Sequence, residues 1–203
     1  MNFKKPKVVI SKCLEFEPCR YDGQVISNKY VRKLKKHVDF ITVCPEVEIG
    51  LGTPREPIHL IKEKNNLTLY QPSSDKDLSV LMNNFSNNFL ESLASIDGFI
   101  LKSKSPSCGI TSAKLYPNKI IKSPMGHGPG MFSSNIIKKF PNHPKEEDKR
   151  LNDVYLREHF YTSIFTICEF RNINSFKSLY SFQAKHKLLF MVYNQTRMRI
   201  LGK

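Results

Sequence analysis

Three short runs of apolar, mostly β-branched residues place the strongest limit on how this chain can fold. They occupy residues 7–11, 40–43 and 98–102. None alternates between apolar and polar residues, and each is followed by turn residues, which is typical of strands buried on both faces of a parallel sheet. Between them, residues 27–38 and 75–95 carry apolar residues at helical spacing. Strands that alternate with helices predict an α/β domain with a mostly parallel sheet and flanking helices.

The character of the sequence changes near residue 140, where Pro141 and Pro144 interrupt a charged segment that is typical of a linker. Two helical patterns follow it, with no strand pattern. We therefore predict an α/β domain in residues 1–143 and a small α-helical C-terminal appendage in residues 144–203. Within the first part, residues 119–122 also have the pattern of a short strand.

The composition excludes several classes of protein. Apolar residues make up 40% and aromatic residues 11% of the 203 positions, which excludes a disordered chain. No apolar run approaches the ~20 residues of a membrane span, and the apolar segment after the basic start is too short for a signal peptide. We expect a cytoplasmic protein without a membrane partner, whose five cysteines are too few and scattered for a disulfide framework.

The cysteines stand where chemistry would be expected. Cys13 follows the first predicted strand, Cys44 follows the second, and Cys108 comes shortly after the third. The carboxyl ends of parallel strands open on one edge of a sheet, so these three residues should converge. Three thiolates suit a soft metal or an iron–sulfur cluster that leaves one iron without a protein ligand. Cys19 is a candidate fourth ligand, whereas Cys168 lies on an apolar helix face and is predicted to be a core residue.

Residues beside two of these cysteines could supply the rest of a catalytic site. Glu46 lies two positions beyond Cys44, where burial would raise its pKa toward the range of a general base. The turn at residues 105–109 offers the hydroxyls of Ser105 and Ser107 and several free amides, which together could hold an anion or a carbonyl oxygen.

Two further loops add charged groups. Arg20 and Asp22 lie in residues 20–23, and Arg55 lies in the proline-flanked residues 53–57. Each group alone is typical of a structural ion pair, but together they predict a pocket at the strand ends. We therefore predict that Glu46 and Ser105 are catalytic, with Asp22 as the next candidate base, and that Arg20, Ser107 and Arg55 bind substrate.

Five motifs of this sequence resemble the thiouracil desulfidase family in order and spacing. They are ISKC at 10–13, CRYDG at 19–23, VCPE at 43–46, GLGTPREP at 50–57 and LKSKSPSCG at 101–109. The resemblance implies an oxygen-sensitive [4Fe–4S] cluster and the removal of sulfur from thiolated uracil, which gives uracil and hydrogen sulfide. It implies Cys13, Cys44 and Cys108 as cluster ligands, and Glu46 and Ser105 in proton transfer and substrate positioning.

The C-terminal part has a counterpart of its own. Residues 140–153, 156–160 and 182–189 resemble the start of a second, uncharacterised helical domain that is often fused to the first. The sequence stops at Lys203, before that domain would be complete, so either the domain is naturally shortened or the sequence is a cut form of it.

Two alternatives remain at this stage. The net charge of +14, spread along both parts of the chain, also suits an RNA-binding or tRNA-modification-related protein. A structural zinc module would use the same cysteines, although such sites usually contain close Cys-x-x-Cys pairs, which the sequence lacks. We favour an iron–sulfur desulfurase that acts on a small thiolated nucleobase.

Overall fold

The computed structural model describes residues 4–64 and 66–201. The first of its two sheets is parallel throughout, which confirms the predicted α/β class. The order of its strands is β2 (Asp39–Val43), β1 (Lys7–Ser11), β6 (Gly98–Leu101) and β9 (Lys145–Glu147). The second sheet is mixed, and its order is β5 (Lys76–Asp77), β4 (Asn66–Gln71), β3 (His59–Glu63), β7 (Ala113–Tyr116) and β8 (Gly126–Gly128).

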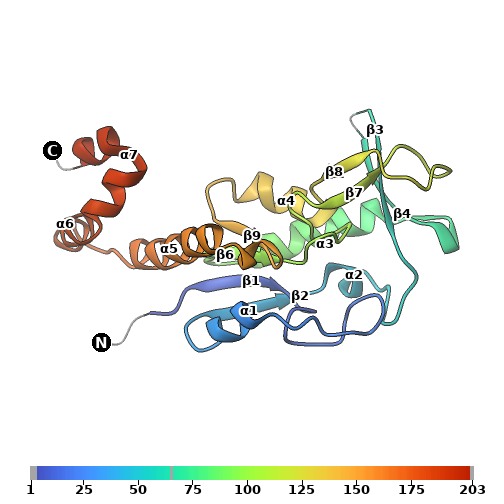
Figure 1. Ribbon diagram of the computed structural model, residues 1–203, viewed down its shortest axis with the longest axis horizontal. Helices are drawn as coiled ribbons and strands as arrows, with labels where there is room; N and C mark the ends of the chain where they lie inside the picture. Colours follow the sequence, from blue (N-terminus) through green and yellow to red (C-terminus); the bar gives the residue numbers. More distant parts are fainter. Residues whose placement is uncertain (1–3, 65, 202–203) are drawn as a thin grey trace.

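Helices flank the first sheet and continue beyond it at the C-terminal end (Figure 1). In chain order they are α1 (Lys29–Leu34), α2 (Pro45–Glu48), α3 (Ser79–Ser92), α4 (Met131–Lys139), α5 (Val154–Arg171), α6 (Phe176–Lys185) and α7 (Lys187–Leu201). Helix α7 is kinked at Asn194, whose backbone is not helical. In the described residues, no helix combines the length and the apolar character that crossing a membrane requires.

Strand β1 is apolar on both sides because each side faces a separate core. Val9 belongs to a core that also contains residues of α3, α4 and the second sheet. Val8 and Ile10 belong to another core, which contains residues of α1 and α5. All three side chains are fully buried. This explains why the strand shows no alternation between apolar and polar residues.

Helix α5 completes the second of these cores. Its Phe160 and Ile164 are buried there beside residues of the parallel strands. At its end, Arg171 forms an ion pair with the fully buried Asp97 at 2.8 Å, and Asp97 also accepts a hydrogen bond from the amide of Lys7. The division between residues 143 and 144 stays a prediction, but α5 is packed on the sheet of the first part.

The predicted linker is partly a strand. Residues 145–147 form β9, which pairs with β6 in parallel, so the expectation of no strand after residue 143 was wrong. The charges that suggested a linker are buried instead, because Glu147 and Asp148 accept hydrogen bonds from backbone amides. The second sheet was not predicted at all.

Two local predictions also fail. Residues 119–122 are not a strand, because the side chain of Asn118 accepts hydrogen bonds from the amides of Ile120 and Ile121 and holds them in a turn. The second helical pattern of the C-terminal part is not one helix but two, since α6 ends and α7 begins around His186.

Gly98 provides a test of how tightly α5 is packed. A Cβ atom at Gly98 would lie 2.7 Å from Cγ2 of Ile164 and 3.1 Å from the carbonyl oxygen of Pro144. We expect Gly98→Ala to lower the free energy of unfolding by about 1–3 kcal/mol, the usual cost of overpacking, as measured by urea denaturation. Gly126→Ala is the matched control, because no atom lies within 4 Å of its added Cβ, and it should change stability by less than ~1 kcal/mol. Equal effects of the two substitutions would contradict the close packing.

Candidate functional site

Cys13 and Cys44 follow the ends of two neighbouring parallel strands, so they lie at the same edge of the sheet. Strands β1 and β2 pair with Ser11 opposite Val43, and the amide of Lys12 donates to the carbonyl of Val43 at 2.8 Å. Both cysteines are buried, as is Cys108. All three line one cavity of about 430 Å³.

The loop that carries Cys108 is held by two side chains. Ser105 Oγ accepts hydrogen bonds from the amides of Ser107 at 3.2 Å and Cys108 at 3.0 Å. Glu147 in β9 accepts three more through one oxygen, from the successive amides of residues 110–112 at 2.6, 2.9 and 3.1 Å. The buried carboxylate thereby satisfies amides that would otherwise be unpaired.

Ser107 belongs to this loop but does not line the cavity. Its side chain is fully buried, and its hydroxyl has no hydrogen-bond partner in the described part of the chain. Gly130 packs against it so closely that a Cβ atom there would lie 2.5 Å from the carbonyl oxygen of Ser107. Ser107 therefore does not line the site to which sequence analysis assigned it.

Cys19 is a fourth thiol in the same cavity. It is buried, and the thiols of Cys13 and Cys44 are close enough to shift its pKa. Cys44 Sγ also donates to the carbonyl oxygen of Cys19 at 3.6 Å. In contrast, Cys168 lies away from this cavity, on the buried face of α5.

The thiols of Cys19, Cys44 and Cys108 are hard to ionise, because their surroundings raise their pKa values. Donation of its proton toward the sulfur of Cys13, together with burial, raises the pKa of Cys19 to about 11, although the interaction with Cys44 opposes the rise. The hydrogen bond with Cys19 and burial raise the pKa of Cys44, and burial raises the pKa of Cys108. A bound metal would have to displace these protons, because only the thiolate is a good ligand.

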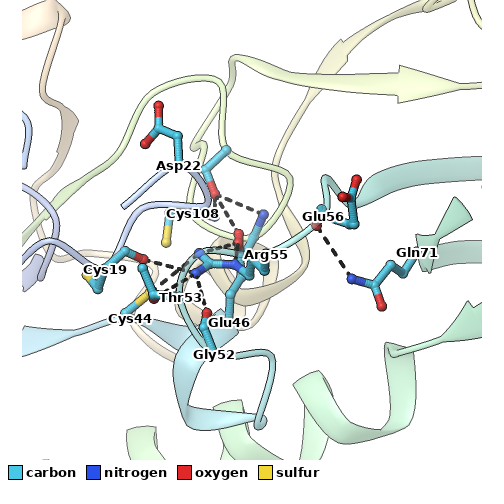
Figure 2. A network of polar contacts seen from close by, with 12 residues as sticks. Cys19, Asp22, Cys44, Glu46, Gly52, Thr53, Arg55, Glu56, Gln71 and Cys108 are labelled. Carbon is cyan, nitrogen blue, oxygen red and sulfur yellow. Dashed lines mark hydrogen bonds and ion pairs between the residues drawn. The ribbon is translucent and has the colours of Figure 1, made fainter. Parts of the chain in front are cut away.

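Arg55 lies at the centre of the polar network shown in Figure 2. Its guanidinium pairs with Glu46 Oε2, at 2.9 Å from Nε and 2.7 Å from Nη2. It also donates to the carbonyl oxygens of Cys19 at 3.0 Å and Gly52 at 2.9 Å. The other carboxylate oxygen of Glu46 accepts a hydrogen bond from Ser105 Oγ at 3.3 Å. Arg55 was predicted to bind substrate, but its donors are engaged in holding Glu46 and the Cys19 loop.

The remaining predicted residues differ in their placement. Arg20 lines the cavity and forms an ion pair with Asp22. Asp22 itself does not line the cavity. It accepts a hydrogen bond from the amide of Gln24 at 3.2 Å and so belongs to the turn that supports Arg20.

Sequence analysis missed one wall of the cavity. His59 in β3, with Lys114 and Tyr116 in β7, also lines it. The alternation of residues 113–116 could have indicated that Lys114 and Tyr116 share a face. Nothing in the sequence places β3 beside β7, because their pairing joins residues far apart in the chain.

The donor set fits an iron–sulfur cluster in its chemistry, since four buried thiols line one cavity. Within the described ranges, no three His, Cys, Asp or Glu side chains surround a common point as the ligands of a single metal ion do. A preformed zinc site is therefore not supported.

Comparison with known proteins identifies related chains. The family model described as 2-thiouracil desulfurase matches residues 8–148. The uncharacterised protein YbbK of Bacillus subtilis (strain 168) is 31% identical over 109 residues, which are 50% of this chain and 72% of YbbK. The solved structure of the [4Fe-4S]-dependent thiouracil desulfidase TudS matches with a TM-score of 0.56 and 26% identity, and the match covers 76% of this chain and 99% of that one.

Breaking the ion pair between Arg55 and Glu46 on one side only should destabilise the fold strongly. Only 5% of the Arg55 side chain and 11% of the Glu46 side chain is exposed. Arg55→Met leaves the carboxylate buried without its partner, so we expect the free energy of unfolding to fall by about 3–5 kcal/mol, as measured by urea denaturation of the cluster-free protein.

Two further variants test the cause of that loss. Adding Glu46→Gln to Arg55→Met removes the uncompensated charge and should restore most of the stability. Lys119→Met breaks an exposed ion pair with Asp75 and should cost less than ~1 kcal/mol. A double variant no more stable than Arg55→Met would show that lost packing, rather than the buried charge, causes the effect.

Proposed function

The chain belongs to the 2-thiouracil desulfurase family, and from this premise we propose that it removes sulfur from thiolated uracil or a related thiolated nucleobase with the help of a [4Fe–4S] cluster. Cys13, Cys44 and Cys108 would hold the cluster. The observation that carries this proposal is that three buried cysteines from separate loops line one cavity, beside a buried carboxylate. The [4Fe-4S] dependence of the related TudS supports the choice of cofactor.

The proposed reaction exchanges sulfur for oxygen without a redox change. Water adds to the carbon that carries sulfur, the carbon–sulfur bond breaks, and the products are the oxo base and hydrogen sulfide. Sulfide is a poor leaving group in water. When bound, the cluster supplies a thiophilic Lewis acid that can accept it.

In this proposal, Glu46 accepts the proton of the attacking water. Arg55 fixes one of its carboxylate oxygens, and Ser105 donates a hydrogen bond to the other. The carboxylate is thus held in one orientation at the wall of the cavity, as general base catalysis requires. Ser105 also orders the amides of the Cys108 loop, so it can position the substrate and the loop together. Asp22 lies outside the cavity lining, which argues against it as the base.

The two alternative functions receive less support. A structural zinc module would need ligands grouped around one ion, and no such group occurs in the described residues. An RNA-binding or tRNA-modifying role still rests on the net charge of +14. That role stays a prediction, and the desulfurase proposal does not depend on it.

The cluster proposal predicts the outcome of single cysteine substitutions. Protein reconstituted anaerobically should be brown and bind about four iron atoms per chain. Cys13→Ala, Cys44→Ala and Cys108→Ala should each lose most of the iron and the visible absorption. Cys168→Ala is the matched control, because this cysteine is equally buried but lies in α5. Colourless wild-type protein with stoichiometric zinc would overturn the proposal.

Cys19→Ala separates three-cysteine from four-cysteine ligation. With three ligands, this variant should retain its iron, because Cys19 would contribute only its thiol contacts with Cys13 and Cys44. Loss of iron comparable to that of Cys44→Ala would make Cys19 a ligand and would contradict an iron free of protein ligands.

Glu46→Gln tests the proposed base. The amide keeps the size of the side chain but cannot accept the proton, so sulfide release from a thiolated uracil should fall by about 10²–10⁴-fold. Ser105→Ala should cost less, because it leaves the carboxylate in place. Because Glu46→Gln also deprives Arg55 of its charged partner, rates are compared only between samples of equal iron content and thermal midpoint. Near-normal turnover by Glu46→Gln would remove Glu46 from the mechanism.

A further inference from the structure

Two aromatic rings are stacked on the wall of the cavity that the second sheet provides. His59 begins β3 and Tyr116 ends β7. Their ring centroids are 4.5 Å apart and their planes differ by 15°. The two strands are parallel, with Leu60 opposite Leu115 and Ile61 opposite Tyr116, so the rings are diagonal neighbours on one face of the sheet.

Packing of the core does not require these rings. The residues between them in the ladder, Leu60 and Leu115, point to the other face and are buried in the main core. His59 and Tyr116 are only partly buried, and both line the cavity that contains the cysteines. Because each ring covers one face of the other, a planar ligand in the cavity can extend this stack on an outer ring face.

The polar groups on this wall suit a planar ligand with hydrogen-bond acceptors at its edge. Burial lowers the pKa of His59, which favours the uncharged imidazole near neutral pH. Lys114, which is opposite His59 in the ladder and also lines the cavity, can donate a hydrogen bond to a carbonyl oxygen. A flat ring with oxygen or sulfur atoms at its edge matches both features.

We propose that His59 and Tyr116 form a stacking platform that binds the pyrimidine ring of the substrate. This inference rests on the proposed function, since it names how the same site selects its substrate. The platform recognises the planarity of the ring rather than the sulfur atom. It therefore favours aromatic thiolated pyrimidines over saturated or open-chain thioamides, and it also binds the sulfur-free product.

The kinetic test compares variants that lose the ring with variants that keep it. Stacking on an aromatic side chain changes base affinity by about 5- to 100-fold. His59→Leu and Tyr116→Leu should raise KM for 2-thiouracil by roughly this factor, while kcat changes less than ~3-fold and iron content is unchanged. His59→Phe and Tyr116→Phe should stay within ~3-fold of the wild-type KM. Tyr180→Leu, an exposed aromatic residue on α6, is the control and should have no effect.

A binding test does not depend on turnover. Wild-type protein should bind uracil more tightly than 5,6-dihydrouracil, whose ring is not flat, and both leucine variants should lose this preference, as measured by calorimetry. Unchanged KM and unchanged preference in both leucine variants would overturn the platform. The platform would also be overturned if the phenylalanine variants raised KM as much as the leucine variants do. The polar atoms of His59 and Tyr116, and not their ring faces, would then bind the substrate. Failure of the proposed function would look different, because wild-type protein would release no sulfide although the binding comparison could still be made.

Discussion

The parallel pairing of β1 with β2 and β6 is the constraint on which the candidate site depends. Because the strands run in the same direction, the chain leaves β1 and β2 at one edge, and Cys13 and Cys44 follow directly. Pairing alone does not place Cys108, whose loop extends beyond β6. That loop is fixed by β9, the neighbouring strand, through the carboxylate of Glu147. The order of four strands thus determines where all three thiols lie.

The parts of the site that could be predicted are those set by local sequence. Cys13 and Cys44 adjoin apolar runs whose identity as strands was evident, and parallel strands share an edge. The support of the Cys108 loop could not be predicted in this way. Glu147 accepts its hydrogen bonds from amides about 35 positions away in sequence, and a charged residue beside prolines is more often exposed. The Glu147 carboxylate can be buried only because the folded chain brings amides of residues 110–112 to it as hydrogen-bond donors.

The same distinction applies to the fold. The apolar pattern of α5 was recognised, but the surface on which Phe160 and Ile164 pack is a property of the whole molecule. Strands β3 and β7 are short, and they pair across a long stretch of chain that includes β6. Neither has the continuous apolar run that made the central strands recognisable, because β7 alternates between buried and less buried residues and β3 has only two consecutive buried residues, Leu60 and Ile61. The second sheet therefore escaped prediction, and the aromatic wall of the cavity with it.

Residues from both sheets line the cavity, so a contact between the two sides must fix their relative position. Arg55 is placed to do this, because it lies in the segment that leads from α2 to β3, four residues before His59. Its guanidinium is bound to Glu46 and to the carbonyl oxygen of Cys19, both on the thiol side of the cavity. The buried ion pair therefore orients the carboxylate and also anchors the start of the second sheet beside the cysteines. The guanidinium of Arg55 thus sets the geometry of the candidate site through its contacts with other protein groups.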